Sequence, residues 1–329
     1  MAITLAQMKE GMSDKVKEGV INVFLTESAI LQDLPFDDAV SPSGGSTLTY
    51  GYVQEKIPAQ TSFRAINSEY SPNQAQIEQK TVDLKIFGGS FEIDRVLKNA
   101  EGMYNNVAYQ LQEKVKSAVM TFHDAMINGD SAKNSAQFDG LDKFLVGQKT
   151  EYNTGAVIDL STKAKLEENA SAFYEKLKKL INSTKADALL VNEDMLLKIE
   201  SVAAYLGYKT ESEEAFGRKY TMIGNVRLCD LGNSVSVSGE TVTETPIIKV
   251  GSRTVGSTSA TGITDIYAVH YSVEDGFHGV TLTGDGAVSE YIPDFSQPGA
   301  VKKGEVEMVA AVALKKTKSA GVLRNIKIA

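Results

Sequence analysis

Residues 91–97 read Phe-Glu-Ile-Asp-Arg-Val-Leu, and this short stretch decides the fold. Up to Asp94 apolar and polar residues alternate, as they do in a strand with one buried face. From residue 97 onward, apolar residues recur at steps of three, four or seven, the period of one helix face. The pattern predicts a helix over 97–128, about 45–50 Å long at 1.5 Å per residue. Gly129 is a natural residue to end it.

The second unusual feature is residues 54–76. They are polar, contain two prolines and show no helical period, and an alternating strand precedes them at 47–53. Such a long stretch without elements of its own is uncommon in a compact domain, and it usually serves a function or an interface. The strand pieces 82–86 and 91–94 follow it. The Gly88-Gly89 pair between these pieces predicts a bulge or bend.

Outside these features the sequence predicts an N-terminal arm and an α/β region. Residues 5–24 form a helix with a narrow apolar stripe, which suits packing on a partner surface. An extended stretch at 29–36 and a turn at 41–46 follow. Downstream, a helix over 162–182 starts at Ser161, a strand covers 188–191, and a helix over 194–206 starts at the Asn192 cap. The C-terminal part is β-rich, with strands at 226–229, 247–250, 266–269 and 306–314, separated by Gly/Ser/Thr-rich loops at 232–245 and 251–264.

Composition excludes several classes of protein. The 329 residues are 42% hydrophobic and 23% charged, which is ordinary for a globular chain and rules out wholesale disorder. Cys229 is the single cysteine, so a disulfide scaffold is excluded. The sequence shows no apolar run of membrane-helix length and no secretion signal, so we expect a cytoplasmic origin.

The charge balance argues against a dedicated DNA-binding protein. The chain carries 34 Lys and Arg against 42 Asp and Glu, a net charge of −8. The C-terminal residues 301–329 are the exception, with seven Lys and Arg against two Glu. A nucleic-acid contact is one interpretation of this tail. A solvated strand edge or a salt-bridged interface is the favoured interpretation.

The sequence contains no recognisable catalytic, cofactor or metal site. The three histidines lack partners at ligand spacing, and there is no phosphate loop, dinucleotide fingerprint or nucleophile elbow. His123 is expected on a surface or interface. His270 and His278 flank an Asp-Gly turn and are expected to face each other across it. Cys229 is expected to be a small buried residue. These absences favour a structural or binding protein over an enzyme, with no catalytic residues, cofactor or metal.

The order of elements resembles that of the major capsid protein of tailed bacteriophages, which has the Hong Kong 97-type fold. The resemblance covers nearly the whole chain. It rests on residues 91–97 leading into the helix, and on Asn-Gly-Asp at 128–130 followed by Phe-Asp-Gly-Leu at 138–141. It implies an α+β fold with an N-arm, an extended two-stranded extension loop, a long spine helix, and peripheral and axial domains.

The resemblance also implies how the chain divides. Residues 1–35 would be the N-terminal arm and residues 46–90 the extension loop. The axial domain would be 151–284. The peripheral domain would combine 36–45, 91–150 and 285–329, with the spine helix at 97–128.

A shell protein needs many modest contacts repeated by symmetry, and head-to-tail contacts generate rings. We therefore expect inter-subunit contacts at Glu55, Lys56 and Arg64 of the extension loop, and at Glu92 and Arg95 of the strand–helix junction.

The implied function is self-assembly, as hexamers and pentamers, into an icosahedral shell around double-stranded phage DNA, without sequence-specific binding. The implied partners are further copies of the chain, a separate scaffolding protein and a portal, and no membrane. The place of action would be the virion, assembled in the bacterial cytoplasm. An encapsulin-like nanocompartment shell and an unrecognised soluble α/β enzyme remain alternatives.

Overall fold

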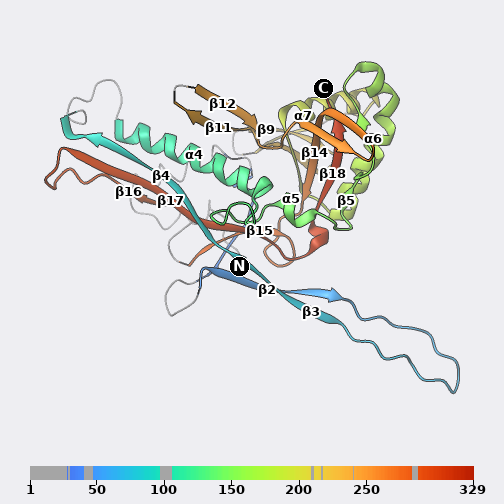
Figure 1. Ribbon diagram of the computed structural model, residues 1–329. Helices are drawn as coiled ribbons and strands as arrows, with labels where there is room; N and C mark the ends of the chain where they lie inside the picture. The colour runs from blue at the N-terminus through green and yellow to red at the C-terminus, as the bar shows by residue number, and fades with distance from the viewer. Residues whose placement is uncertain are drawn as a thin grey trace.

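The structure is a computed structural model that describes residues 28, 30–40, 47–96, 106–208, 211–215, 218–239, 241–283 and 288–329. Figure 1 shows an elongated sheet with a long helix along it, a second sheet flanked by helices, and two projecting hairpins. The predicted helix at 5–24 and turn at 41–46 lie outside the described residues. The same holds for residues 97–105 of the predicted spine helix.

The elongated sheet has the strand order β1-β15-β17-β16, and β4 also pairs with β17. β17 is the centre of this sheet, because its N-terminal part pairs with β4 and β16 and its C-terminal part pairs with β15. The strands are β1 (Phe36–Val40), β4 (Lys85–Asp94), β15 (Phe277–Leu282), β16 (Val288–Tyr291) and β17 (Val301–Leu314).

Helix α4 (Asn106–Asn128) packs along β4 and β17 (Figure 1). Its Phe122 is fully buried, and the ring lies 6.3 Å from that of Phe36, 6.0 Å from Phe87 and 5.9 Å from Phe138, between centroids. Aromatic pairs at this spacing stabilise a core by more than the burial of their apolar surface alone. One aromatic cluster therefore joins the helix, the sheet and the loop that follows the helix.

The second sheet has the order β5-β18-β14-β7-β10-β9-β8, with β13 paired to β14 and β6 to β18. Two helices, α6 (Lys163–Thr184) and α7 (Glu193–Tyr205), share an apolar core with it. A short helix α5 (Leu141–Leu145) and a 3-10 turn η2 (Thr317–Ser319) lie between the two sheets in the chain path. The strands are β5 (Glu151–Tyr152), β6 (Ile158–Asp159), β7 (Ala188–Val191), β8 (Glu211–Ala215), β9 (Arg218–Ile223), β10 (Val226–Asp230), β13 (Gly251–Val255), β14 (Thr258–Val269) and β18 (Ala320–Lys327).

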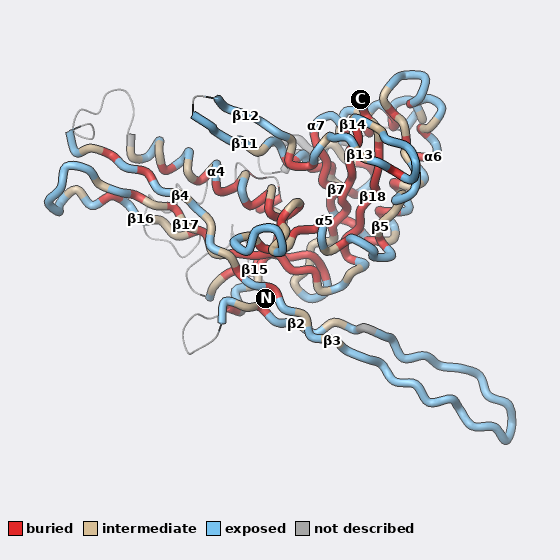
Figure 2. Tube along the Cα trace, in the orientation of Figure 1, coloured by how far each residue is buried: buried red, intermediate tan, exposed pale blue. Residues whose placement is uncertain are grey.

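Two hairpins stand apart from both sheets. β2 (Thr49–Ile57) and β3 (Gln76–Asp83) form a long projection whose outer part is exposed throughout (Figure 2). Residues 49–83 form this projection, the finger. β11 (Asn233–Ser238) and β12 (Thr241–Pro246) form the second hairpin, above α4 in Figure 1.

The α/β part of the sequence prediction is confirmed, with one wrong cap. β7 occupies the predicted residues 188–191, and the Asn192 side chain accepts a hydrogen bond from the Met195 amide at the start of α7. At α6, however, Thr162 is the cap. The Ser161 hydroxyl and amide both donate to the Asp159 carboxylate, at 2.6 and 2.9 Å, so this side chain does not cap the helix.

The predicted bulge at Gly88-Gly89 is wrong. β4 pairs with β17 through both glycines without a register shift. The strand break lies earlier, at buried Leu84, whose amide donates to the Leu48 carbonyl. A Cβ on Gly88 would lie 2.0 Å from the Val306 carbonyl oxygen, so glycine permits close approach of two backbones.

Four further predicted segments are wrong in the β-rich and N-terminal parts. The Gly/Ser/Thr-rich loops at 232–245 and 251–264 are instead strands of the β11–β12 and β13–β14 pairs, because alternating Ser, Thr and Val favour strands. The predicted strand at 247–250 is a connection without strand pairing, in which Ile247 and Ile248 are buried and Lys249 is exposed. Residues 30–33 form a turn, closed by a bond from the Leu34 amide to the Ile30 carbonyl, and are not extended.

Candidate subunit-contact surfaces

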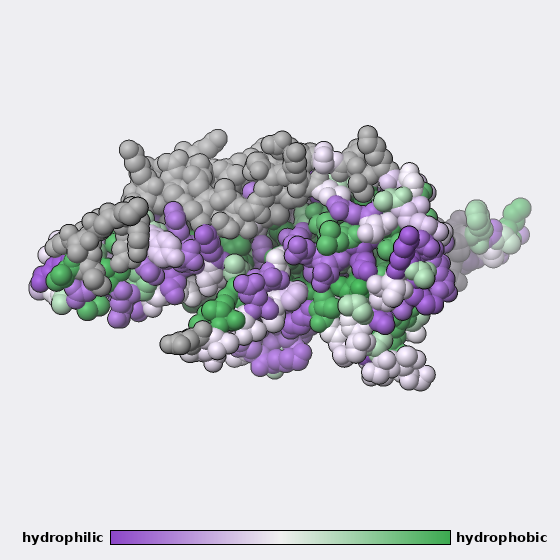
Figure 3. Space-filling model, turned by 90° about the horizontal axis from the view of Figure 1, so that it is seen from above, coloured by the Kyte–Doolittle hydropathy of each residue, from purple (hydrophilic) through white to green (hydrophobic). Residues whose placement is uncertain are grey.

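The outer finger, residues 58–75, has no core of its own. The Gln60 amide donates to the Asn73 side-chain oxygen at 2.8 Å, and the Asn73 side chain donates back to the Gln60 carbonyl at 2.9 Å. Phe63 and Ile66 near the tip are 107% and 90% exposed. Figure 3 shows apolar residues among hydrophilic ones where this projection emerges at the right. Clustered exposed apolar side chains indicate a contact surface.

Arg64 organises the tip of the finger. Its guanidinium donates to the carbonyl oxygens of Ala65 and Ser68, at 3.3 and 3.2 Å, and lies 5.4 Å from the centroid of the Tyr70 ring. Asn67 adopts a left-handed conformation with φ of 62°, which Asn tolerates better than most residues. The tip is therefore a shaped turn that presents one cation beside exposed apolar groups.

The base of the finger is attached to the body by side-chain hydrogen bonds. The Tyr52 hydroxyl donates to the Leu314 carbonyl at 3.0 Å, and the Gln54 amide donates to the Lys315 carbonyl at 3.1 Å. The Tyr50 hydroxyl donates to the Asp37 carboxylate at 2.7 Å. Burial, together with this carboxylate, raises the pKa of Tyr50 well above its ordinary value, so the hydroxyl remains a donor. These bonds set the direction in which the finger leaves the body.

His278 lies beside this base and not where the sequence predicted it. It is fully buried, and its ring packs edge-on against Tyr50 with centroids 5.8 Å apart. Burial, together with the nearby Lys315 ammonium, lowers its pKa to about 4. His270 instead pairs with the Asp187 carboxylate at 2.7 Å. The two histidines do not face each other, because β15 turns His278 inward toward β2.

Glu55 and Lys56 lie together on β2, near the base of the finger. Glu55 is exposed and lines a cavity of about 600 Å³, shared with Lys149, Asp275 and residues 315–318. The structure thus places two of the expected contact residues between the body and the tip, and Arg64 further out.

Glu92 and Arg95 lie together at the outer end of β4, at the opposite end of the molecule from the finger tip (Figure 1). Both are exposed. Glu92 is the cross-strand partner of Lys303, and the Arg95 amide donates to the Ala300 carbonyl at 2.8 Å. The expected contact residues therefore form two separated groups, as a head-to-tail contact requires.

The described residues just before β1 belong to the core. Ile30, Leu31 and Leu34 are buried, and the Ser28 hydroxyl lies 2.6 Å from His123 Nε2. His123 is 5% exposed, so its expected surface position is wrong: α4 turns this side chain toward the N-terminal segment. Asp33 pairs with Arg227 at 2.6 Å.

Within the described residues, no group of three or more His, Cys, Asp or Glu side chains could hold a metal ion. Cys229 is buried, as expected, and burial raises its thiol pKa to about 12.

A buried cluster of charged side chains beside the second sheet was not predicted from the sequence. The Arg324 guanidinium binds Asp142, Glu151 at 2.8 Å and Asp265 at 3.1 Å, and Arg253 binds Asp265 at 2.8 Å. Asp265 is 4% and Arg324 9% exposed. Arg324 belonged to the basic C-terminal tail in the sequence, where nothing signals burial. Lys303, Lys316 and Lys327 of that tail also make ion pairs, which favours the salt-bridged interpretation.

Comparison with solved structures identifies the architecture. A Microbacterium phage Oxtober96 structure matches 92% of this chain and 91% of its own, with a TM-score of 0.55 and 9% identity. The holo-SrpI encapsulin complex from Synechococcus elongatus PCC 7942 matches 89% and 91%, with a TM-score of 0.54 and 12% identity. The capsid of a native GTA particle matches 88% of both chains, with a TM-score of 0.53 and 12% identity.

This chain has the Hong Kong 97-type fold. No known family profile and no curated protein matches the sequence. The expected fold is confirmed, and the expected contact residues stay predictions. Among the described helices of this Hong Kong 97-type chain, none is long and apolar enough to cross a membrane.

Proposed function

We propose that this chain is a major capsid protein that assembles with itself into a closed icosahedral shell around double-stranded phage DNA. The observation that carries the proposal is the finger. It exposes Phe63 and Ile66 almost completely on a chain whose fold matches shell proteins along nearly its whole length. Burying such side chains in a neighbouring copy gains about 1.5–3 kcal/mol each, and symmetry repeats that gain around every ring.

We propose that each expected domain has its own role in the shell. The finger lies within 46–90 and reaches a neighbour as the extension loop. The sheet around β17 and helix α4 belong to the peripheral domain, built from 36–45, 91–150 and 285–329. Residues 151–284 form most of the axial domain, which lines the centre of a hexamer or pentamer. Residues 1–35 act as the N-terminal arm.

In this proposal the chain is a structural protein and not an enzyme. It works in the virion after assembly in the bacterial cytoplasm, with a separate scaffolding protein and a portal. The net charge of −8 suits a container that holds DNA without reading its sequence.

A second candidate is an encapsulin-like nanocompartment shell. The specific observation in its favour is the match to the SrpI encapsulin, whose TM-score is similar to those of the Oxtober96 phage structure and the GTA particle capsid. The contents of the shell distinguish the two candidates, since one encloses DNA and the other a protein cargo.

Light scattering and electron microscopy of the purified chain test the proposal, with expression alone and together with the genes beside its own. Large shells, or rings that convert to them, support the capsid. Small uniform shells with co-purifying protein inside support the nanocompartment. A chain that stays monomeric under both conditions contradicts both shell functions.

Deleting residues 58–75 tests the role of the finger. We expect the variant to keep its thermal unfolding temperature, because these residues are exposed and bond only among themselves. We expect shell assembly to be lost. The control replaces Gly155–Val157, where Gly155 and Ala156 are exposed and Val157 is half-buried, by Gly-Ser-Gly and should keep assembly.

A further inference from the structure

The β11–β12 hairpin is a separate two-stranded sheet that contacts α4 through β11 and leaves an apolar face exposed. Among the described strands it pairs with none outside itself, and such hairpins are marginally stable alone. Val235, Val237 and Val242 lie on one face and are 43%, 67% and 59% exposed. Glu244 lies directly opposite Val235 on that same face. The other face carries only serines and threonines.

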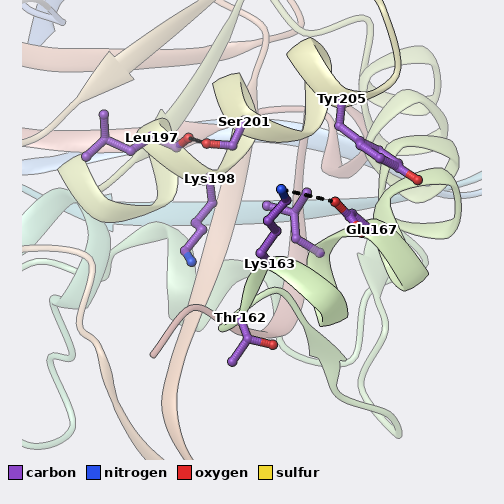
Figure 4. Close-up of a pocket in the computed structure, with 8 residues that line it drawn as sticks. Thr162, Lys163, Glu167, Leu197, Lys198, Ser201 and Tyr205 are labelled. Atoms are coloured by element: carbon purple, nitrogen blue, oxygen red, sulfur yellow. Dashed lines mark hydrogen bonds and ion pairs between the residues drawn. The ribbon is translucent and has the colours of Figure 1, made fainter.

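A groove between α6 and α7 offers matching chemistry. It measures about 510 Å³ and is lined by Thr162, Lys163, Leu166, Glu167, Leu197, Lys198, Ser201 and Tyr205 (Figure 4). Leu197 and Tyr205 are each 54% exposed on the single chain. The groove therefore combines an apolar surface with two lysines and a single acid.

The N-terminal end of α6, which borders this groove, carries positive side chains where the helix dipole favours negative ones. Its first turn contains no acidic residue but holds Lys163 and Lys165, where the helix dipole already places positive charge. Lys165 is paired with Glu168 at 2.7 Å. The Lys163 side chain is 90% exposed and lies 3.9 Å from Glu167, at the limit of an ion pair. A carboxylate from outside would stabilise this end of the helix.

The hairpin supplies such a carboxylate. Residues 233–246 contain Glu240 and Glu244 and no Lys or Arg. Figure 1 shows the hairpin pointing to one side of the molecule, while α6 and the finger lie toward the other. One neighbour could then receive the finger and place its own hairpin in the groove, in a head-to-tail contact that closes a ring.

We propose that the valine face of the β11–β12 hairpin docks in the α6–α7 groove of a second copy of this chain, with Glu244 beside Lys163. The inference rests on the proposed shell function, because it describes a contact inside the rings from which the shell is built.

Engineered disulfides test the contact directly. The variant with Val242→Cys and Leu197→Cys should form linked chains under mild oxidation, up to the size of the ring, on a non-reducing gel. Native Cys229 is buried and does not compete. The control pairs Thr243→Cys, on the hydroxyl face, with Leu197→Cys and should give at least about tenfold less product, because that thiol points away from the groove.

A charge exchange gives an independent test. Glu244→Lys should raise the protein concentration needed for assembly about tenfold, since like charges at an interface are costly. Adding Lys163→Glu to the same chain should restore assembly, while Thr243→Lys should leave it nearly unchanged.

The outcomes separate this inference from the shell function. Shells that form without the Val242–Leu197 crosslink overturn the hairpin contact and leave the capsid proposal intact. Crosslinking of Leu197→Cys to a different protein overturns the second copy as the occupant. A parent chain that never oligomerises overturns both proposals.

Discussion

The amide of Gly140 donates a hydrogen bond to the carbonyl oxygen of Gly129 at 2.9 Å, which joins the two short motifs that follow α4. Asp139 then accepts from the Ser131 amide at 2.8 Å, and Lys143 bridges Asp130 and Asp139. Hydrogen bonds from Lys143, Lys133 and the Ala132 amide lower the pKa of Asp130 to about 2. The motifs that pointed to the fold are thus one structural unit that turns the chain away from the end of the helix.

Both glycines in this unit are predicted to resist substitution. A Cβ on Gly129 would lie 2.2 Å from the Phe138 carbonyl oxygen, and a Cβ on Gly140 would lie 2.6 Å from that of Ala125. Gly129→Ala and Gly140→Ala should each lower the free energy of unfolding by about 1–3 kcal/mol. Urea denaturation measures this. Gly155→Ala, with open space around it, is the control and should change stability by less than about 0.5 kcal/mol.

The anchors of the finger should control its direction. Tyr52→Phe removes the hydrogen bond to the Leu314 carbonyl, and Gln54→Ala removes the one to the Lys315 carbonyl. Each variant should lower the free energy of unfolding by about 0.5–1.5 kcal/mol. Amide hydrogen exchange in β2 should become faster, and assembly should slow. Gln79→Ala, at an exposed position of β3, is the control. Unchanged exchange in β2 would show that the anchors are not needed.

Replacing Arg324 should destabilise the fold more than replacing a surface charge. Arg324→Met removes one ion-pair partner of the buried Asp265 and the ion pair to Glu151. We therefore expect the free energy of unfolding to fall by about 3–5 kcal/mol. Lys327→Met on the same strand removes an ion pair between a partly exposed lysine and Asp159, 3.9 Å apart. It should lower the free energy of unfolding by less than about 1 kcal/mol. Thermal unfolding compares the two. Equal losses would mean that the buried cluster contributes no more than the surface pair.

His278 should make stability depend on pH. Its folded-state pKa of about 4 lies below the ordinary value of 6.5 because the folded environment disfavours the charged form. The unfolded chain therefore binds the proton first as pH falls, and stability decreases from pH 6.5 toward pH 4 by up to about 3 kcal/mol. His278→Gln should flatten this part of the curve in urea titrations at several pH values. A wild-type slope in the variant would contradict the assignment to His278.

Glu92 and Arg95 should matter more for assembly than for folding. Both side chains are exposed, so Glu92→Lys with Arg95→Glu should change the free energy of unfolding by about 0.5 kcal/mol or less. Ring formation, measured by light scattering, should fall clearly. The control is Lys116→Glu on α4, a half-exposed residue whose ion-pair partner is Glu113 of the same helix. Parallel losses of stability and assembly would place the two residues in an intrasubunit role.

Much of the architecture could be predicted from sequence because its signals are local. The period of α4, the Asn192 cap and the apolar run of β7 each depend on residues a few positions apart. The Ser/Thr-rich hairpins were missed because loops and exposed strands share the same residue types. The order of these elements was enough to indicate the Hong Kong 97-type fold.

The contacts that define the surfaces could not be predicted in this way. Residues between 278 and 314 supply partners for residues near 50: the Tyr52 hydroxyl bonds to the Leu314 carbonyl, and His278 packs on Tyr50. The burial of Arg324 also depends on Asp142 and Asp265, far away in sequence. Sequence alone determined the order and type of the helices and of the apolar strands such as β7, since propensity and period act within a few residues. Only the tertiary structure decided which charges are buried and which apolar faces stay open, because burial depends on chain segments that meet after folding.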